Sequence, residues 1–230
     1  MSTAVIDYGA GNIRSVENAM KALGQKTCLT SSASDILAAD HVILPGVGAF
    51  GDAMACIRRK GLEEVIRTVC DSGVPFLGIC LGLQILFEES EESPGVKGLS
   101  ILKGRIVRFP AKQSDLFRRG NGSPDAFLKV PEIGWNALMY PKQTSGNPGS
   151  DISENRPGRL FQAVPEGSHV YYVHSYYLQA KDPSIVKARS EYGVSFDASV
   201  ESGNVFACQF HPEKSEKVGM QILKNFLEVR

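Results

Sequence analysis

Apolar runs and amphipathic stretches alternate along the first ninety residues of the chain. From Ile13 to Leu23 an apolar residue recurs at every third or fourth position, and Gly24 ends this helical pattern. Similar helical spacing recurs in residues 54–57 and 62–69. Strands that alternate with helices predict a parallel, doubly wound α/β sheet, with the active site at the carboxyl ends of its strands. The apolar runs expected to form these strands are residues 3–6, 27–30, 41–44 and 74–79.

The second half of the chain has a different pattern. Short candidate strands are separated by turn-rich segments, which is typical of an antiparallel extension. Residues 111–129 and 141–158 are rich in Gly, Ser, Pro and Asn, so we expect surface loops there, and residues 217–230 have helical spacing. No linker or repeat divides the pattern, which favours a single domain over residues 1–230. The candidate strands are residues 105–109, 135–139, 170–174, 185–190 and 205–210.

Composition narrows the class of protein. The 230 residues include 25 basic and 25 acidic side chains, so nothing indicates a nucleic-acid or anionic-membrane surface. The first residues lack the features of a signal peptide, and no apolar stretch approaches the length of a membrane span. Five cysteines, an odd number without C-x-x-C spacing, predict reduced thiols in a cytoplasmic protein. We expect no disulfide framework, no metal and no cofactor.

The segment Gly78-Ile79-Cys80-Leu81-Gly82 follows an apolar run and precedes a helical pattern. A strand, a glycine-bracketed nucleophile and a helix form a nucleophile elbow, here with cysteine as the nucleophile. Glycines allow the close backbone approach of this sharp turn, and the helix N-terminus favours a thiolate and a developing oxyanion. A buried structural cysteine is the other interpretation of Cys80. The remaining cysteines lie in strand or helix patterns and are expected to be packing residues: Cys28, Cys56, Cys70 and Cys208.

Two glycine-rich turns follow earlier strands. Residues 45–50, Pro-Gly-Val-Gly-Ala-Phe, can bring backbone N–H groups close to an oxyanion or a substrate, although a plain tight turn would use the same residues. Residues 7–12 lack the G-x-G-x-x-G pattern, which argues against a dinucleotide site. The acidic run at residues 88–92 is expected to be the solvated end of the helix after the elbow.

A catalytic cysteine needs a proton carrier, and four histidines are candidates. His211 follows an apolar strand and so emerges at a strand end, where Glu213 can reach the same side of an extended chain. This carboxylate would fix the imidazole tautomer. His174 is the competing base, without a carboxylate close in sequence, whereas His41 and His169 are expected in a core strand and a turn. Cysteine, histidine and glutamate together predict acyl-transfer chemistry.

Residues 78–84, taken with His211-Pro212-Glu213, resemble the class I (triad) glutamine amidotransferases. Within that family, further motifs along nearly the whole chain resemble the glutaminase subunits of imidazole glycerol phosphate synthases. The resemblance implies a flavodoxin-like fold, with a mostly parallel central sheet flanked by helices and an antiparallel extension. These motifs are residues 7–12, 45–50, 134–136, 174–177 and 209–215.

The resemblance also implies a mechanism. Cys80 would attack the side-chain amide of glutamine and form a glutamyl thioester. His211, held by Glu213, would protonate the departing ammonia and then activate water. The N–H of Leu81 and a backbone N–H of the Val47-Gly48 turn would form the oxyanion hole. The residues implied in binding the α-amino and α-carboxylate groups of glutamine are Gln84, Glu92, His174, Ser175 and Tyr176.

Members of this family pass the ammonia to a (β/α)8 cyclase subunit in a heterodimer. The cyclase joins it to the ribonucleotide PRFAR and produces imidazole glycerol phosphate and AICAR, for histidine and purine synthesis. Asn12, Phe50 and Trp135 are the candidates for the subunit contact, and the alternative for a lone tryptophan is a place in the core. The sequence departs from the family at Glu132, where histidine is frequent.

Three other functions stay open at this point. The chain could serve another triad amidotransferase, for pyridoxal phosphate, anthranilate or GMP synthesis, although residues 7–12 and 134–136 argue against this. It could be a free-standing cysteine hydrolase that turns over without a partner. It could also be a catalytically silent regulatory module of the same fold, which the intact Cys80, His211 and Glu213 disfavour.

Overall fold

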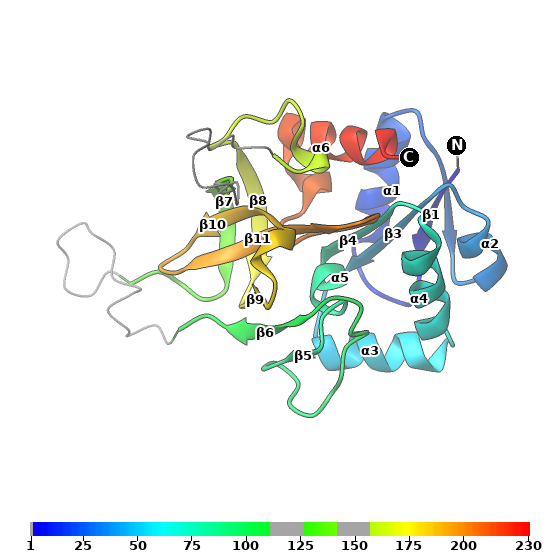
Figure 1. Ribbon diagram of the computed structural model, residues 1–230, viewed down its shortest axis with the longest axis horizontal. Coiled ribbons are helices and arrows are strands. Elements are labelled where there is room, and N and C mark those ends of the chain that lie inside the picture. Colours follow the sequence, from blue (N-terminus) through cyan, green and yellow to red (C-terminus); the bar gives the residue numbers. More distant parts are fainter. Residues whose placement is uncertain (1, 111–126, 142–156) are drawn as a thin grey trace, which may run out of the picture.

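The computed structural model describes residues 2–110, 127–141 and 157–230. Most of its strands belong to one ten-stranded sheet with helices on both faces (Figure 1). Five strands form the parallel half, in the order β2-β1-β3-β4-β12. Counted among themselves they have the order 2-1-3-4-5, which is the flavodoxin-like arrangement. They are β1 (Ser2–Ile6), β2 (Lys26–Thr30), β3 (His41–Gly46), β4 (Phe76–Cys80) and β12 (Val205–Cys208).

The sheet continues beyond β12 with antiparallel strands, in the order β11-β9-β6, and β5 closes this edge. β10 pairs with β11, and β7 and β8 form a separate antiparallel pair. The predicted fold class, including the antiparallel extension, is therefore confirmed. These strands are β5 (Glu89–Ser90), β6 (Gly104–Arg108), β7 (Glu132–Ala137), β8 (His169–His174), β9 (Tyr176–Ala180), β10 (Val186–Glu191) and β11 (Ser195–Ser202).

Helices cover the two faces of the sheet and enclose two apolar cores. One core joins the sheet to α1 (Ile13–Ala22), α6 (Glu216–Glu228) and the β7–β8 pair. The other joins it to α2 (Ala33–Leu37), α3 (Phe50–Arg59), α4 (Glu63–Ser72) and α5 (Leu81–Gln84). Short 3-10 turns occur at Arg159–Phe161, Pro183–Ile185 and Pro212–Lys214. Within the described ranges, each helix is too short or too polar to cross a membrane.

The helix after the elbow is shorter than predicted. α5 ends at Gln84, and the acidic run is not a helix end, because Glu89 and Ser90 form β5 beside β6. The start of α5 packs closely against β3, since a Cβ on Gly82 would come within 1.9 Å of the Leu44 carbonyl oxygen. Only glycine permits this approach, which holds the elbow tightly on the sheet.

Other expectations need correction. Cys28 is exposed, because β2 is the edge strand of the sheet and has few neighbours to cover it. His169 begins strand β8 and does not lie in a turn. β9 and β11 were not among the expected strands. Most of the two segments expected as surface loops, residues 111–129 and 141–158, lies outside the described residues.

Candidate active site

Cys80 lies at the end of β4, where the chain turns sharply into α5. Its backbone has φ 55° and ψ −108°, a conformation that L residues rarely adopt. Neighbouring glycines make the turn possible, since a Cβ on Gly78 would come within 2.7 Å of the Gly82 carbonyl oxygen. The Cys80 side chain is nearly buried, with 7% of its residue surface exposed. This geometry is that of a nucleophile elbow.

His211 and Glu213 form a buried pair immediately after β12. His211 Nδ1 lies 2.8 Å from Glu213 Oε1, and the two side chains are 1% and 0% exposed. His211 has an extended backbone, as expected, and the 3-10 turn that begins at Pro212 brings the Glu213 carboxylate to the imidazole. Asn12 Nδ2 donates to the same Glu213 oxygen at 2.7 Å, which fixes the carboxylate from a segment 201 positions away.

The environment of His211 favours its protonated form. Burial disfavours a charged ring, but hydrogen bonding and charge interactions with Cys80 and Glu213 outweigh burial and raise the pKa of His211 to about 10. Nδ1 donates to Glu213, and Nε2 has no geometrically ideal partner among the described residues. A protonated ring beside the sulfur can give its Nε2 proton to a leaving group during the reaction.

A cavity of about 340 Å3 opens in front of Cys80. All the residues expected to form the oxyanion hole and to bind the substrate meet there, from four separate parts of the chain. Pro131 and Val173 complete the wall. The expected site residues that line this cavity are Val47, Gly48, Cys80, Leu81, Gln84, Glu92, His174, Ser175 and Tyr176.

Several of these side chains are already hydrogen-bonded within the protein. Glu92 Oε2 accepts from the Phe50 backbone N–H at 2.7 Å, at the start of α3. Gln84 Nε2 donates to the Tyr176 carbonyl oxygen at 3.1 Å. His174 uses both ring nitrogens, Nδ1 on the same Tyr176 oxygen at 2.9 Å and Nε2 on Glu132 at 3.1 Å. Its ring therefore faces β7 and is not available as the base for Cys80.

The three residues expected at the subunit contact lie in different surroundings. Phe50 is fully buried in the core under α3, so the expectation that its side chain meets a partner was wrong. Asn12 is half-buried and points to Glu213. Trp135 is 47% exposed and therefore not a core residue. Ile133, two positions away on the same face of β7, is 63% exposed, and together they form an apolar surface that we call the β7 face.

Gln209 and Glu132 belong to this site, although sequence reasoning assigned neither a role. Gln209 is fully buried, and its Nε2 lies 3.7 Å from Cys80 Sγ. Glu132 is 3% exposed and pairs with His174. The sequence offered only their positions as a signal: Gln209 opens the motif of residues 209–215, and Glu132 is a departure from the family two residues before the motif of residues 134–136.

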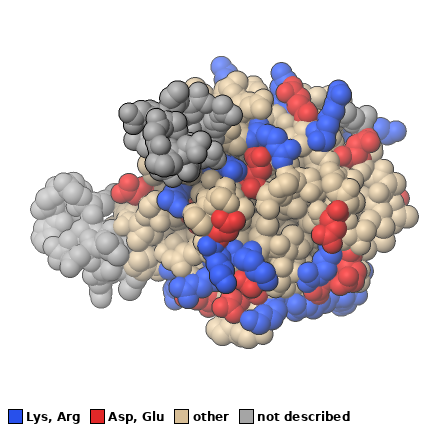
Figure 2. All heavy atoms as spheres, in the orientation of Figure 1, with Lys and Arg blue, Asp and Glu red and all other residues tan. Residues whose placement is uncertain are grey.

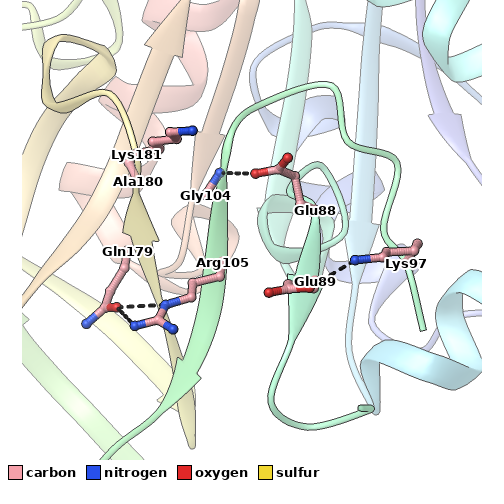
Figure 3. A pocket seen from close by; sticks show the side chains of 8 residues that line it. All are labelled: Glu88, Glu89, Lys97, Gly104, Arg105, Gln179, Ala180 and Lys181. Carbon is pink, nitrogen blue, oxygen red and sulfur yellow. Dashed lines mark hydrogen bonds and ion pairs between the residues drawn. The ribbon is translucent and has the colours of Figure 1, made fainter. Parts of the chain in front are cut away.

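A second hollow, of about 430 Å3, lies at the far edge of the sheet, along β5, β6 and β9 (Figure 3). Several of its charged side chains have partners: Lys97 pairs with Glu89, and the Arg105 guanidinium donates to Gln179. No histidine or cysteine is among its lining residues. Figure 2 shows positive and negative side chains intermingled over one face of the molecule. The lining of the hollow at the sheet edge therefore lacks the cysteine and histidine that the site at Cys80 combines, so we place the candidate chemistry at Cys80.

A cysteine on a strained strand-to-helix turn, beside a buried histidine–glutamate pair in a doubly wound sheet, is the arrangement of a cysteine-dependent enzyme of acyl transfer. The family model for glutamine amidotransferase class-I matches residues 4–229. The chain is 45% identical over 226 residues to imidazole glycerol phosphate synthase subunit HisH of Moorella thermoacetica, covering 98% of this chain and 94% of that one. It is 46% identical over 222 residues to the HisH subunit of Syntrophotalea carbinolica, covering 96% and 97%. The chain therefore belongs to the class-I glutamine amidotransferases, in the family of the HisH subunits.

A solved structure described as a glutamine amidotransferase has the same fold. It superposes with a TM-score of 0.68 at 18% identity, covering 98% of this chain and 97% of that one. At this identity the likeness concerns the fold alone.

Proposed function

We propose that the chain hydrolyses glutamine to glutamate and ammonia through a thioester on Cys80, as the glutaminase subunit of an imidazole glycerol phosphate synthase. The observation that carries this proposal is the buried His211–Glu213 pair beside a cysteine held in an elbow conformation. The relatives named above are subunits of that synthase, which supports the pathway. We treat residues 1–230 as one glutamine amidotransferase domain.

The proposed reaction has two halves. The Cys80 thiolate bonds to the side-chain amide carbon of glutamine, and the carbonyl electrons move to its oxygen. Protonated His211 gives its Nε2 proton to the amide nitrogen. The electron pair on the oxygen re-forms the carbonyl bond, the C–N bond breaks, and ammonia departs, which leaves a thioester on Cys80. Neutral His211 then takes a proton from water, whose oxygen attacks the thioester carbon, and the C–S bond breaks to return the thiolate. Glu213 keeps a proton on Nδ1 throughout and so directs Nε2 to the reaction.

The cavity supplies the remaining groups. Leu81 is the first residue of α5, where backbone N–H groups have no acceptor within the helix and can hold an oxyanion. Val47 and Gly48 line the same space and supply the second N–H. Because Gln84 uses its N–H groups within the protein, we assign its amide oxygen to the α-ammonium of glutamine. We assign the remaining contacts with the α-amino and α-carboxylate groups of glutamine to the backbone of residues 174–176 and to the Glu92 carboxylate, which line the same cavity.

We propose that the β7 face docks on a (β/α)8 cyclase subunit in a heterodimer. Ammonia becomes ammonium in water, so a glutaminase that supplies it must release it into an enclosed partner. Trp135 and Ile133 give this face the exposed apolar character of an interface anchor. The cyclase would join the ammonia to PRFAR. The free state of all five cysteines fits a reducing cytoplasm for the enzyme.

Glutamate release measured with the purified chain, alone and with the cyclase subunit and its ribonucleotide ligand, tests the proposal. We expect weak hydrolysis alone and strong stimulation in the liganded complex, both absent from Cys80→Ala. Fast hydrolysis that the cyclase does not change would indicate a free-standing hydrolase and reject the pathway. No hydrolysis under either condition would indicate a silent module.

A further inference from the structure

The sulfur of Cys80 has a second polar neighbour besides the histidine. Gln209 Nε2 lies 3.7 Å from Sγ, which is hydrogen-bond distance for a sulfur acceptor. Gln209 is the residue after β12, and its side chain is fully buried. A buried amide that faces a reacting atom can stabilise one charge state of that atom over another.

The orientation of the Gln209 amide follows from a chain of hydrogen bonds. A backbone carbonyl oxygen only accepts, so the Gln84 atom 3.1 Å from the Tyr176 oxygen must be its NH2 group. The same NH2 group lies 3.0 Å from Gln209, so the Gln209 atom that faces it must be the oxygen. The NH2 group of Gln209 is then the one that points at Cys80 Sγ.

The series of hydrogen bonds that starts at Cys80 ends at residues of β7. The Tyr176 oxygen also accepts from His174 Nδ1 at 2.9 Å, and the other ring nitrogen, Nε2, lies 3.1 Å from Glu132 Oε2. Glu132 Oε1 in turn accepts from Asn136 Nδ2 at 2.8 Å. A carboxylate, an imidazole, three side-chain amides and the Tyr176 backbone oxygen thus hold one another in fixed orientations from β7 to the nucleophile.

We propose that Gln209 is a further catalytic residue, whose amide N–H donates to Cys80 Sγ and stabilises the thiolate, with Gln84 as the positioning residue that fixes its orientation. A hydrogen-bond donor stabilises the sulfur most when the sulfur carries a negative charge. That state occurs twice in the reaction, before attack on glutamine and again when the C–S bond of the thioester breaks and its electron pair returns to Sγ. The role of Gln209 in turnover rests on the proposed function, whereas its stabilisation of a negative charge on the sulfur does not.

Alkylation of Cys80 by iodoacetamide tests the effect on the sulfur directly, because the thiolate is the form that reacts. Cys28 is exposed and serves as an internal reference thiol in the same sample, with both peptides quantified by mass spectrometry. The variants are Gln209→Met, which removes the donor, and Gln209→Glu, which keeps an acceptor for Gln84 and places a negative group near the sulfur. Gln179→Met, on the exposed side of β9, is the matched control.

We expect the ratio of Cys80 to Cys28 alkylation near neutral pH to fall about tenfold or more in both Gln209 variants and to stay unchanged in the control. In the complex with the cyclase, kcat for glutamine hydrolysis should fall more than KM rises. An unchanged alkylation ratio in either folded Gln209 variant, judged by its thermal melt, overturns the proposal. If Gln209→Met does not fold, Gln209→Glu decides, since it keeps the bond to Gln84. A wild-type chain without glutaminase activity would reject the proposed function and still leave this alkylation test valid.

Discussion

Gly219 is far from the cavity in sequence, yet we predict that its replacement by alanine damages catalysis. Gly219 lies in α6, directly against the turn that carries Glu213. A Cβ added there would lie 1.8 Å from the Pro212 carbonyl oxygen and 2.8 Å from Ser215 Cβ, whereas real Cβ contacts essentially never fall below 3.0 Å. The helix and the turn must therefore separate by about 1.2 Å, within a packed contact that resists such a shift.

Two effects of Gly219→Ala on the stability of the protein act in opposite directions. In an exposed helix, Gly→Ala would stabilise the protein by about 1 kcal/mol through helix propensity. Overpacking in a buried contact costs about 1–3 kcal/mol, so we expect no gain in stability and a loss of up to about 2 kcal/mol. A displacement of about 1 Å in a catalytic group lowers the rate about a hundredfold, and His211 and Glu213 flank Pro212.

The assay compares Gly219→Ala with Lys217→Ala, an exposed position two residues earlier on the same helix. We expect Gly219→Ala to lower kcat for glutamine hydrolysis about a hundredfold in the complex with the cyclase, with an equal or lower melting temperature. The lysine variant should match the wild type in both. A Gly219→Ala protein with a raised melting temperature and normal kcat would refute the argument that this contact positions the triad.

Three further predictions concern the catalytic pair and the β7 face. His211→Asn should lower kcat about 10²–10⁴-fold through lost acid–base catalysis, and Glu213→Gln should cost less, since an amide oxygen can still accept from the ring; a larger loss for Glu213→Gln in a steady-state assay would contradict these roles. The raised pKa of His211, to about 10, predicts an NMR titration in which the ring stays protonated through neutral pH and loses its proton only near that value. In Cys80→Ala the pKa of His211 should be lower, because the interaction with Cys80 raises it, and equal midpoints would refute the coupling. Trp135→Ala should weaken binding to the cyclase by about tenfold or more in a titration while leaving the melting temperature of the free chain unchanged; undiminished affinity would show that the β7 face is not the docking surface.

The parallel half of the sheet could be predicted because its inner strands are buried on both faces. β3, β4 and β12 are buried throughout, and such strands appear as continuous apolar runs. β11 is different, with Phe196, Ala198 and Val200 buried among polar residues. This alternation was a usable signal for a strand, whereas the edge position of β2, which exposes Cys28, depends on strand order and has no local signal.

Some contacts of the candidate site could be predicted from the sequence, and others could not. The elbow is local in the chain, because its glycines and Cys80 are neighbours, and the pairing of His211 with Glu213 spans only two positions. The bond from Asn12 to Glu213 and that from Gln209 to Cys80 span 201 and 129 positions. Contacts of this range arise only when the sheet assembles, so they left no pattern in the sequence. Phe50 was misplaced for a related reason, since a large apolar residue after a glycine-rich turn suits a core and an interface equally.

The central claim is that glutamine is hydrolysed through a thioester on Cys80. Its most direct test is an acid quench of the chain in complex with the liganded cyclase during turnover of isotopically labelled glutamine, followed by mass spectrometry of the peptide that contains Cys80. The account predicts a labelled glutamyl group on Cys80 of the wild type, and neither label nor glutamate release with Cys80→Ala. Continued glutamate release by Cys80→Ala, at a rate near that of the wild type, would contradict it.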